Sequence, residues 1–492
     1  MAIYRNFIGG EWVESASVKT LDNLNPANTD DVLGTVRQST REEARRAVEA
    51  ASEAFRAWRS TPAPARGRIV ARAARLMEDD KETIAGILTR EEGKTLSESR
   101  GELQRSINVA EFCAGEARRM SGETIQSELP LNFAYTIKQP LGVVACITPW
   151  NFPVAIPIWK IAPALVAGNT VVFKPASLTP ATAVRIVEIF EEAGVPPGVL
   201  NLILGSGSDA GDEIVNHPAV RAVSFTGSNE IGIRLYEQVS RRGGKVQCEM
   251  GGKNPVVVME DADLDLAVES TAQGAFGSTG QRCTATSRAI VVNQVAEEFV
   301  RRITRRAQTM RIGDGSDPQT EMGPSVDEHQ FKTVLRYIEI GRDDGATLAC
   351  GGSPASGDGL EKGYFVQPTV FDHVTTEMRI AREEIFGPVL SVLRVRDFEE
   401  AMQAANDSEY GLSSSIFTND AARIFRFVDE IETGMTHINS PTTGGEAHIP
   451  FGGIKATGIG EREQGSTALD FYTELKVVYV DYTGRKREGN LY

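Results

Sequence analysis

Residues that build covalent or metal-bound frameworks are scarce in this sequence. The five cysteines are dispersed and form no CxxC pair, and the five histidines show no metal-ligand spacing such as HExxH. A disulfide scaffold and a zinc site are therefore disfavoured. Whatever chemistry the chain performs is expected to proceed without a protein-bound metal.

Long apolar runs and blocks of one charge are also absent. No segment approaches the roughly 18 uninterrupted apolar residues of a membrane span, and no apolar stretch follows a basic patch at the start. The expected location is the cytoplasm. Lys and Arg number 52 against 67 Asp and Glu, a formal charge of -15 with no run of five like charges. Nucleic acid and anionic membranes are therefore disfavoured as partners.

With 492 residues, the chain is long enough for about three domains at roughly 150 residues each. Residues 40–120 show apolar positions at helical spacing and predict long amphipathic helices. From residue 141, short β-rich runs alternate with helical segments, and a second alternation extends from 254 to roughly 450. This α/β pattern predicts two doubly wound units of similar size that meet along a cleft. In the first unit, ligands are expected beyond the carboxyl ends of the parallel strands. The β-rich C-terminal segment is expected to add a strand elsewhere, either at a sheet edge or across a subunit interface.

Cys283 differs from the other four cysteines, three of which lie in apolar strand-like or helical patterns that are typical of buried thiols. It lies among small polar residues, in GSTGQRCTATSR, beside Arg282. A reactive thiolate needs an accessible, electropositive setting that lowers its pKa from about 8.5. Cys283 is therefore a candidate nucleophile, with an incidental surface or core thiol as the alternative.

Two further residues have positions that suit catalysis. Glu249 precedes two glycines in EMGGKNP, where the backbone can approach a ligand closely. Asn151 lies between two prolines in TPWNFP, so its amide could be held rigidly as a hydrogen-bond donor. Taken singly, each pattern is also explained by an ordinary turn.

Several loops could hold phosphates. GSGSDAG at 205–211 follows a strand and nominally fits the dinucleotide fingerprint, but the acidic residue expected about 20 positions later is missing. FTGSNEIG at 225–232 places Ser228 at an expected helix N-terminus, which would stabilise a diphosphate. Lys174 ends another strand, where it could reach a ribose or phosphate. Structural turns are the alternative for each of these loops.

The motifs occur together and in one order. PWNFP, FKPAS, FTGS, EMGGKNP, GQRCTATSR, EEIFGPV and PFGGIKATG follow one another between residues 149 and 458. In these motifs the chain resembles the NAD(P)-dependent aldehyde dehydrogenase superfamily, and it is most similar to bacterial 2,5-dioxopentanoate (alpha-ketoglutaric semialdehyde) and succinate-semialdehyde dehydrogenases. The resemblance implies an atypical Rossmann cofactor domain at 1–121 and 141–248, a catalytic domain at 249–453, and a small β oligomerisation arm at 122–140 and 466–492.

The resemblance also implies catalytic roles. Cys283 would attack the aldehyde carbon, while Asn151 and the Cys283 backbone N–H would stabilise the oxyanion. Hydride transfer to the nicotinamide would leave a thioester, from which Glu249 would release a free carboxylate by activating water. Lys160 and Glu463 match members of a proton path to this base. A cofactor-independent thioester or ester hydrolase that uses Cys283 and Glu249 is the alternative from another enzyme class.

For the cofactor, the resemblance implies contacts from several loops. The matching positions are Thr148, Pro149, Trp150, Lys174, Ser177, Gly207, Gly211, Thr226, Gly227, Ser228, Gly232, Glu384 and Phe386. Family members that strongly prefer NAD tend to carry glutamate at the position of Ser177, where it repels a 2′-phosphate. A serine leaves Lys174 free to pair with that phosphate. We therefore expect NADP to be accepted alongside NAD, and leave open which of the two is preferred.

A carboxylated substrate needs a cation, and Arg119 or Arg118 is the candidate, because the similar semialdehyde dehydrogenases place an arginine there near the substrate tunnel. A solvated helix arginine is the alternative. Gly277 stands where members specific for succinate semialdehyde have a second arginine. This favours 2,5-dioxopentanoate over succinate semialdehyde or a broad range of aliphatic aldehydes. The expected assembly is a homodimer or homotetramer.

Overall fold

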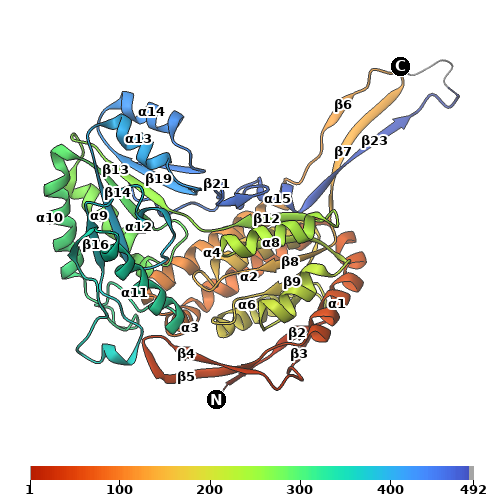
Figure 1. The fold of residues 1–492 in the computed structure, drawn as a ribbon. Helices are drawn as coiled ribbons and strands as arrows, with labels where there is room; N and C mark the ends of the chain where they lie inside the picture. Colours follow the sequence, from red (N-terminus) through yellow and green to blue (C-terminus); the bar gives the residue numbers. More distant parts are fainter. Residues whose placement is uncertain (1, 487–492) are drawn as a thin grey trace.

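Two α/β units and a projecting β-arm make up the structure (Figure 1). The computed structural model describes residues 2–486; Met1 and residues 487–492, which belong to the predicted first domain and the predicted arm, lie outside the described residues. The predicted fold class is confirmed, since each unit is built on a largely parallel sheet with hydrophobic clusters on both faces. No helix in the described part of the chain is long and apolar enough to cross a membrane.

The sheet of the first unit has eight strands, of which the middle five are parallel. In spatial order they are β22 (Gly458–Ile459), β12 (Lys245–Glu249), β11 (Val220–Thr226), β8 (Val143–Ile147), β9 (Thr170–Lys174), β10 (Leu200–Leu202), β2 (Asn6–Ile8) and β3 (Glu11–Val13). Alternate residues of β8 serve different cores: Val144 and Cys146 pack in one hydrophobic cluster, whereas Val143, Ala145 and Ile147 pack in another. Because both faces are buried, the strand is a continuous apolar run.

Helices α1 to α8 surround this sheet. They are α1 (Arg41–Ser60), α2 (Ala63–Asp79), α3 (Lys81–Glu92), α4 (Leu96–Glu116), α5 (Ala155–Ala167), α6 (Pro180–Glu192), α7 (Asp212–Asn216) and α8 (Asn229–Ser240). The helices predicted over residues 40–120 are thus α1 to α4. Thr40 and Glu43 form a reciprocal capping box at the start of α1, which satisfies two otherwise free backbone N–H groups.

The second unit has a seven-stranded sheet of the same type. In spatial order its strands are β15 (Thr347–Cys350), β16 (Thr369–Asp372), β17 (Val389–Val395), β14 (Thr286–Val292), β13 (Asn254–Val258), β19 (Ser413–Phe417) and β20 (Met435–Ile438), with only β15 antiparallel to its neighbour. Its helices are α9 (Leu264–Phe276), α10 (Asn293–Thr309), α11 (Glu328–Asp343), α12 (Arg379–Arg382), α13 (Phe398–Asn406) and α14 (Ala421–Glu430). Along β14, Ile290 and Val292 pack in one cluster and Ala289 and Val291 in the other.

The ends of the strands decide where the sequence motifs meet. In the first sheet, PWNFP, FKPAS, FTGS and EMGG follow or overlap the carboxyl ends of β8, β9, β11 and β12. β8 and β11 are neighbours although β9 and β10 separate them in sequence, so the strand order reverses between them. Open α/β sheets bind ligands at such a switch point. In the second sheet, GQRC and EEIFGP instead precede the amino ends of β14 and β17. The motifs of the first sheet thus lie at the carboxyl ends of its strands, and those of the second sheet lie at the amino ends.

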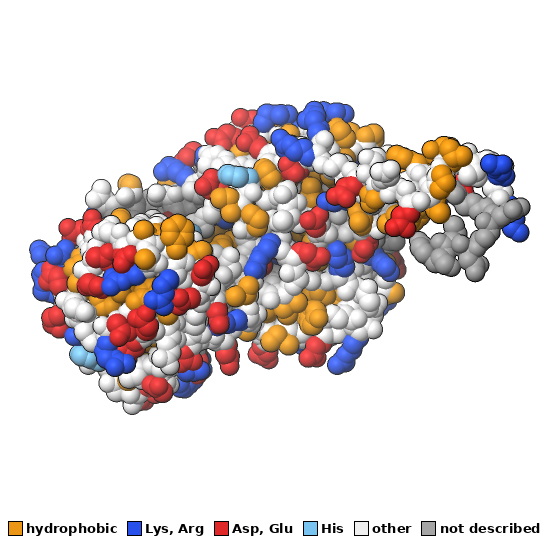
Figure 2. All heavy atoms as spheres, turned by 90° about the horizontal axis from the view of Figure 1, so that it is seen from above, with side chains coloured by type: hydrophobic (Ala, Val, Ile, Leu, Met, Phe, Trp, Pro, Cys, Tyr) orange, Lys and Arg blue, Asp and Glu red, His pale blue; other side chains and the backbone are white. Residues whose placement is uncertain are grey.

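Two segments that lie far apart in sequence form the arm (Figure 1). β7 (Asn132–Pro140) pairs antiparallel with β23 (Thr473–Asp481) along its whole length and with the short β6 (Thr124–Gln126). β23 lies at the edge of this sheet. Its residues Leu475, Val477 and Tyr479 share one face and are 61%, 48% and 71% exposed. Apolar side chains are visible along the arm in Figure 2.

Two smaller sheets and one short helix complete the described structure. β5 (Asn28–Arg37) pairs with β1 (Ala2–Tyr4) and β4 (Thr20–Asn25), and β18 (Tyr410–Gly411) pairs with β21 (Ile454–Lys455). α15 (Ala468–Phe471) leads into β23. The sequence pattern predicts neither small sheet.

Candidate active site

Cys283 follows a strained turn that leads into β14. Ser278, Thr279 and Gly280 have left-handed backbone conformations, with φ of 48°, 59° and 67°. Residues other than glycine rarely adopt this region, and each one costs about 1–3 kcal/mol. At Gly280 a side chain could not be accommodated, because a Cβ would lie 2.3 Å from the carbonyl oxygen of Gly387. The turn therefore restricts the position of the thiol that follows it.

Burial and neighbouring carboxylates keep the Cys283 thiol protonated at neutral pH. The pKa of the thiol is raised to about 12, first by burial and then by the negative charges of Glu384 and Glu249. The electropositive neighbour expected from the sequence is engaged elsewhere, because Arg282 pairs with Glu98 at 3.1 Å. Cys283 nevertheless retains some exposed surface, whereas the other four cysteines are buried.

The Asn151 side chain, which comes from the first unit, forms a hydrogen bond to the backbone just ahead of Cys283 in the sequence. It follows the carboxyl end of β8, and its Nδ2 donates to the carbonyl oxygen of Gln281 at 3.0 Å. That bond uses one of the two amide hydrogens, which leaves the second for a ligand. Asn151 Oδ1 is buried, with no hydrogen-bond partner among residues 2–486. The amide is therefore a candidate oxyanion donor next to Cys283.

A buried ion pair holds the loop that carries Asn151. Lys94 Nζ donates to the Asn151 carbonyl oxygen and to Glu102, both at 2.6 Å. The other Glu102 oxygen accepts from the backbone N–H groups of Val154 and Ala155, where α5 begins. Both charged side chains are almost fully buried, so their attraction and these bonds must offset the desolvation of two charges. No sequence motif marks this pair, because Lys94 lies in the short loop before α4 and Glu102 is one of several acidic residues of that helix.

Glu249 is the last residue of β12, and its carboxylate is buried against the backbone of Gly452 and Gly453. The Gly453 N–H donates to its Oε2 at 3.3 Å, and a Cβ at Gly452 would lie 2.3 Å from its Oε1. Glycine, here at φ 149°, permits that approach. Burial and then the negative charge of Glu463 raise the pKa of Glu249 well above its usual value. A carboxylate with a raised pKa is a stronger base, which suits it to removing a proton from water or a thiol.

Lys160 and Glu463 form a buried ion pair whose charges act on Glu249. The Lys160 ammonium contacts one carboxylate oxygen of Glu463 and donates to Ser224 Oγ at 2.9 Å. The second Glu463 oxygen is buried without a hydrogen-bond partner in the described part of the chain. Glu463 raises the pKa of Glu249 and Lys160 lowers it. The structure thus brings together the residues that the sequence analysis assigned to a proton path.

The candidate cofactor residues of the first unit lie at the carboxyl end of its sheet. Lys174 Nζ donates to the carbonyl oxygens of Pro175 at 2.7 Å and Gly205 at 3.1 Å, and burial lowers its pKa to about 8. Ser177 Oγ donates to the same Gly205 oxygen at 3.1 Å. A Cβ at Gly211 would lie 3.4 Å from the Lys174 side chain. Because Lys174 is bonded to carbonyls and not to a carboxylate, a phosphate or ribose hydroxyl would be a favourable partner.

Unused hydrogen-bonding groups in two other loops suit a diphosphate and a ribose. Ser228 is the N-cap residue of α8, and its hydroxyl makes no capping bond to the helix. The buried hydroxyls of Thr148 and Thr226 have no partner among the described residues. A helix N-terminus attracts anions through its free N–H groups. The residues present therefore fit a dinucleotide at this edge of the sheet.

Three predicted cofactor glycines lie where the backbone is crowded or turns sharply. A Cβ at Gly232 would lie 2.4 Å from Met250 Sδ, and one at Gly227 would lie 2.4 Å from the ring of Phe225. Gly207 begins a π-helical turn, Gly207–Gly211, that follows β10 and leads into α7. Because these residues have no side chain, the loops that contain them can pack closely against the sheet.

Glu384 and Phe386 face the first unit from the loop before β17. The Gly252 N–H donates to Glu384 at 3.0 Å, and burial raises the pKa of this carboxyl to about 7. Phe386 has a φ of 57°, and its ring meets that of Trp150 edge to face, with 5.4 Å between centroids. Trp150 and Pro149 belong to the loop after β8. The two units thus contact each other at the residues predicted to bind the nicotinamide end of the cofactor.

The predicted substrate arginines do not line the pocket of about 560 Å³ described below. Arg118 and Arg119 follow the end of α4 and are exposed, and Arg119 pairs with Glu116 at 2.8 Å. Their role in substrate binding stays a prediction. A pocket of about 560 Å³, here called the Phe451 pocket, instead contains an arginine that the sequence analysis missed. Its wall consists of Arg105, 434–437, 443–446 and 449–451.

The spacing of buried residues along α4 indicates that Arg105 is partly buried. Val109 and Cys113 lie four and eight residues later on α4 and are buried, so Arg105 occupies the same stripe of the helix. A charged residue on an otherwise buried stripe indicates a partly buried cation. Long amphipathic helices contain many arginines, however, and this one has no motif around it.

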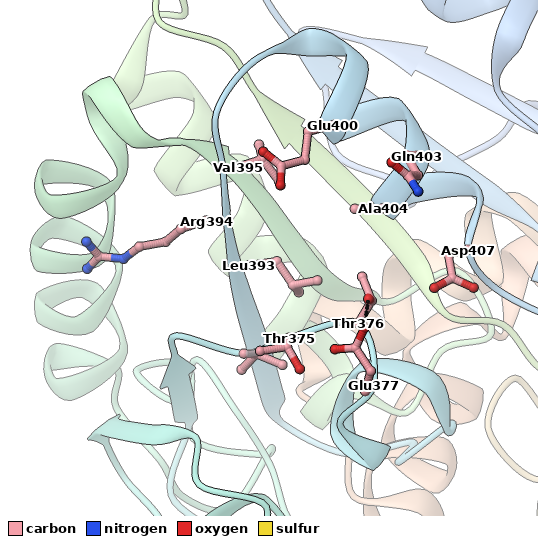
Figure 3. A pocket seen from close by; sticks show the side chains of 11 residues that line it. Thr375, Thr376, Glu377, Leu393, Arg394, Val395, Glu400, Gln403, Ala404 and Asp407 are labelled. Carbon is pink, nitrogen blue, oxygen red and sulfur yellow. Dashed lines mark hydrogen bonds between the residues drawn. The ribbon is translucent and has the colours of Figure 1, made fainter.

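Another pocket, of about 320 Å³, lies between β17 and α13 (Figure 3). None of the candidate catalytic or cofactor residues lines it. Three of its four charged side chains form ion pairs, which are Arg394 with Asp372, Glu400 with Arg396, and Asp407 with Arg382. The fourth, Glu377, accepts a hydrogen bond from the Thr376 hydroxyl. It therefore supports no separate chemical site.

Iodoacetamide is expected to alkylate one cysteine of the folded protein, Cys283, because the others are buried. Since the thiolate reacts and the thiol pKa is about 12, the rate should still rise about tenfold per pH unit near pH 9. Peptide mass spectrometry over a pH series measures the site and the rate. Cys283→Ala is the control that should take up no label, and a plateau below about pH 8 would contradict the buried-thiol assignment.

Comparisons with known proteins agree with this geometry. The model of the aldehyde dehydrogenase family matches residues 12–478. The chain is 48% identical to the alpha-ketoglutaric semialdehyde dehydrogenase of Bacillus subtilis (strain 168), over 97% of this chain and 98% of the relative. It is 46% identical to the alpha-ketoglutarate semialdehyde dehydrogenase of Haloferax volcanii, over 97% of this chain and 99% of the relative.

A solved structure with the same fold is that of betaine aldehyde dehydrogenase from Staphylococcus aureus in complex with NAD+. The two share 38% sequence identity and superpose with a TM-score of 0.96, over 99% of this chain and 96% of the other. Family match, sequence identity and fold agree over nearly the whole length. The chain therefore belongs to the aldehyde dehydrogenase family.

Proposed function

We propose that this chain oxidises a carboxylated semialdehyde, such as 2,5-dioxopentanoate, to the carboxylate with NAD+ or NADP+ in the cytoplasm. Relatives at 45–48% identity are named for alpha-ketoglutaric semialdehyde or 2,5-dioxopentanoate. The observation that carries the catalytic assignment is the meeting of Cys283, Asn151 and Glu249 between two sheets. Each alone has an ordinary structural explanation, but together they supply a nucleophile, an oxyanion donor and a base.

The first half of the reaction begins at the Cys283 sulfur. Because burial keeps this thiol protonated, its proton has to leave as the sulfur attacks the aldehyde carbon, and Glu249 is a suitable acceptor. The carbonyl oxygen becomes an oxyanion that Asn151 Nδ2 and the Cys283 backbone N–H would stabilise. A bound nicotinamide dinucleotide would supply the hydride acceptor. Loss of hydride from the former aldehyde carbon leaves a thioester on Cys283.

The second half hydrolyses that thioester. Glu249 removes a proton from water as the water oxygen attacks the thioester carbon, and the C–S bond then breaks to give the carboxylic acid and the Cys283 thiolate. The acid passes its proton to the thiolate, which leaves the carboxylate product and the resting thiol. The buried Lys160–Glu463 pair next to Glu249 offers a route by which the proton can leave the base. The presence of Glu249 favours a free carboxylate over transfer of the acyl group to another thiol.

The cofactor contacts come from both units. Lys174 would bind the adenosine ribose or its 2′-phosphate, and Ser228 at the start of α8 the diphosphate. Glu384 would bind the nicotinamide ribose, and Phe386 with Trp150 would limit the position of the ring. Since Ser177 carries no charge, the protein would accept NADP as well as NAD.

Purified protein with 2,5-dioxopentanoate is expected to reduce NAD+ or NADP+, measured as the absorbance of the reduced nicotinamide. Cys283→Ala should abolish this signal, because the nucleophile is lost. Glu249→Gln should lower steady-state turnover by about a hundredfold or more, yet still form about one equivalent of reduced cofactor per site, because hydrolysis needs the base most.

Cys350→Ala is the matched control, since it removes a buried thiol on β15 and should retain activity. Absence of reduced cofactor with every aldehyde tested would contradict the proposed reaction. Hydrolysis of an activated ester without any cofactor reduction would favour the hydrolase alternative instead.

Ser177→Glu is expected to lower kcat/KM for NADP+ by about tenfold to a hundredfold while changing that for NAD+ by less than about threefold. A carboxylate at this position would repel the 2′-phosphate and compete for Lys174. Steady-state kinetics with both cofactors measure the ratio. Ser240→Glu, at the exposed end of α8, is the control, and an unchanged ratio in Ser177→Glu would refute the proposed role of Ser177.

We further propose that the arm joins copies of the chain into a dimer or tetramer. Leu475, Val477 and Tyr479 form an exposed apolar stripe on the edge strand, and such a stripe favours pairing or packing with another chain. Changing all three to lysine should lower the mass measured by light scattering after size-exclusion chromatography. Lys476→Glu, on the other face of β23, should leave the mass unchanged, and a monomeric wild-type protein would contradict the assembly.

A further inference from the structure

Asn254, the first residue of β13, holds the backbone at and after Cys283. Its Nδ2 donates to the carbonyl oxygens of Cys283 and Ala285, both at 2.8 Å. Its Oδ1 accepts from the Ser413 N–H at 3.0 Å. Only 2% of Asn254 is exposed, so water does not compete for these bonds. Both N–H groups of this buried amide are therefore committed to the segment that carries the thiol.

Two amide side chains from different units hold this segment on both sides of the thiol. Asn151 donates to the carbonyl oxygen of Gln281, two residues before Cys283. Asn254 donates to that of Cys283 itself and to that of Ala285, two residues after it. The Cys283 N–H, the proposed oxyanion donor, lies between the first two of these carbonyls. A shift of either carbonyl would therefore change the direction of that N–H.

Gly252 lets the strand that begins with Asn254 approach Cys283 closely. A Cβ at Gly252 would lie 2.9 Å from the Cys283 carbonyl oxygen and 3.1 Å from Asn254 Oδ1, which leaves no room for a side chain. The Gly252 N–H donates to Glu384 at 3.0 Å. The short segment that follows Glu249 thus contacts both the candidate cofactor carboxylate and the backbone of the candidate nucleophile.

We propose that Asn254 is a positioning residue of the reaction, which holds the Cys283 carbonyl oxygen and so fixes how the thiol and the Cys283 N–H meet the aldehyde. This inference rests on the proposed function, in which Cys283 attacks the aldehyde carbon. Asn254 touches no reacting atom and acts only through the backbone of Cys283. The sulfur and the oxyanion donor must be aligned with the same carbonyl group at once, and a displacement of about 1 Å costs about a hundredfold in rate.

Asn254→Ala is expected to slow the first turnover by about tenfold or more, because the attack loses its alignment. Stopped-flow absorbance of the reduced nicotinamide, with saturating NAD+ and 2,5-dioxopentanoate, measures this rate. The dissociation constant of NAD+, measured by calorimetry, should change by less than about threefold, since the three hydrogen bonds of Asn254 go to none of the candidate cofactor residues.

Asn201→Ala is the matched control. Asn201 is a fully buried asparagine of β10 with the same bonding pattern: its Nδ2 donates to the carbonyl oxygens of Gly198 at 2.8 Å and Val171 at 3.4 Å, and its Oδ1 accepts from the Gly9 N–H at 2.9 Å. Both variants lose three buried bonds, so both should lower the melting temperature. Only Asn254→Ala should slow the first turnover, and a smaller loss than tenfold, or an equal loss in Asn201→Ala, would overturn the role of Asn254.

Alkylation by iodoacetamide separates a misplaced thiol from a loosened fold. In Asn254→Ala the label should stay confined to Cys283, at a rate within about threefold of the wild type, because alkylation needs an exposed thiol but no alignment with an oxyanion donor. Labelling of the buried cysteines in this variant would overturn the proposal, since the slow turnover would then come from a general loss of structure.

Asn254→Ser retains a hydroxyl donor for one of the two carbonyls, and it decides the question if the Ala variant does not fold. A loss of about threefold or more in the first turnover, with NAD+ binding unchanged, would support the proposal, and a smaller loss would overturn it. A wild-type protein that forms no reduced cofactor, or a Cys283→Ala variant that still forms it, would instead contradict the proposed function itself.

Discussion

The candidate site depends on how two sheets meet, because strand ends of opposite direction bring its residues together. The first sheet presents the carboxyl ends of β8 and β12, which Asn151 follows and Glu249 ends, and the second presents the amino end of β14, which Cys283 precedes. Neither sheet alone carries the groups that the reaction needs. The hydrogen bond from Asn151 to Gln281 crosses between the units, so their alignment determines whether the amide lies next to the thiol. Groups on rigid strand ends keep their geometry, and small displacements cost large factors in rate.

Burial shifts the pKa values of four groups in the candidate site. It raises the pKa of Cys283, Glu249 and Glu384 and lowers that of Lys174. A neutral thiol is protected from adventitious reaction until its proton can leave, and a carboxylate with a raised pKa is the stronger base. Two buried ion pairs, Lys160 with Glu463 and Lys94 with Glu102, stabilise charge in the same interior.

Several parts of the fold and site could be predicted because their signals are local. Strand β8 is a continuous apolar run because both of its faces are covered, and the start of α1 is marked by the capping pair Thr40 and Glu43. Cys283 is distinguishable by its small polar neighbours. Lys94 and Arg105 could not be identified in this way, because their importance arises from which face of α4 or its preceding loop is turned inward. A similar reason applies to β1 of the small N-terminal sheet, because it pairs with β5 far along the chain, whereas β4 and β5 are consecutive strands.

The sequence by itself determined which reactive residue types are present, their order relative to the strands, and the family to which those motifs belong. Only the tertiary structure decided their chemical state. Arg282 is adjacent to Cys283 in sequence, yet folding pairs it with Glu98 and places Glu384 and Glu249 near enough to raise the thiol pKa instead. Electrostatic effects depend on distance and burial, and both are set by residues that lie far apart along the chain.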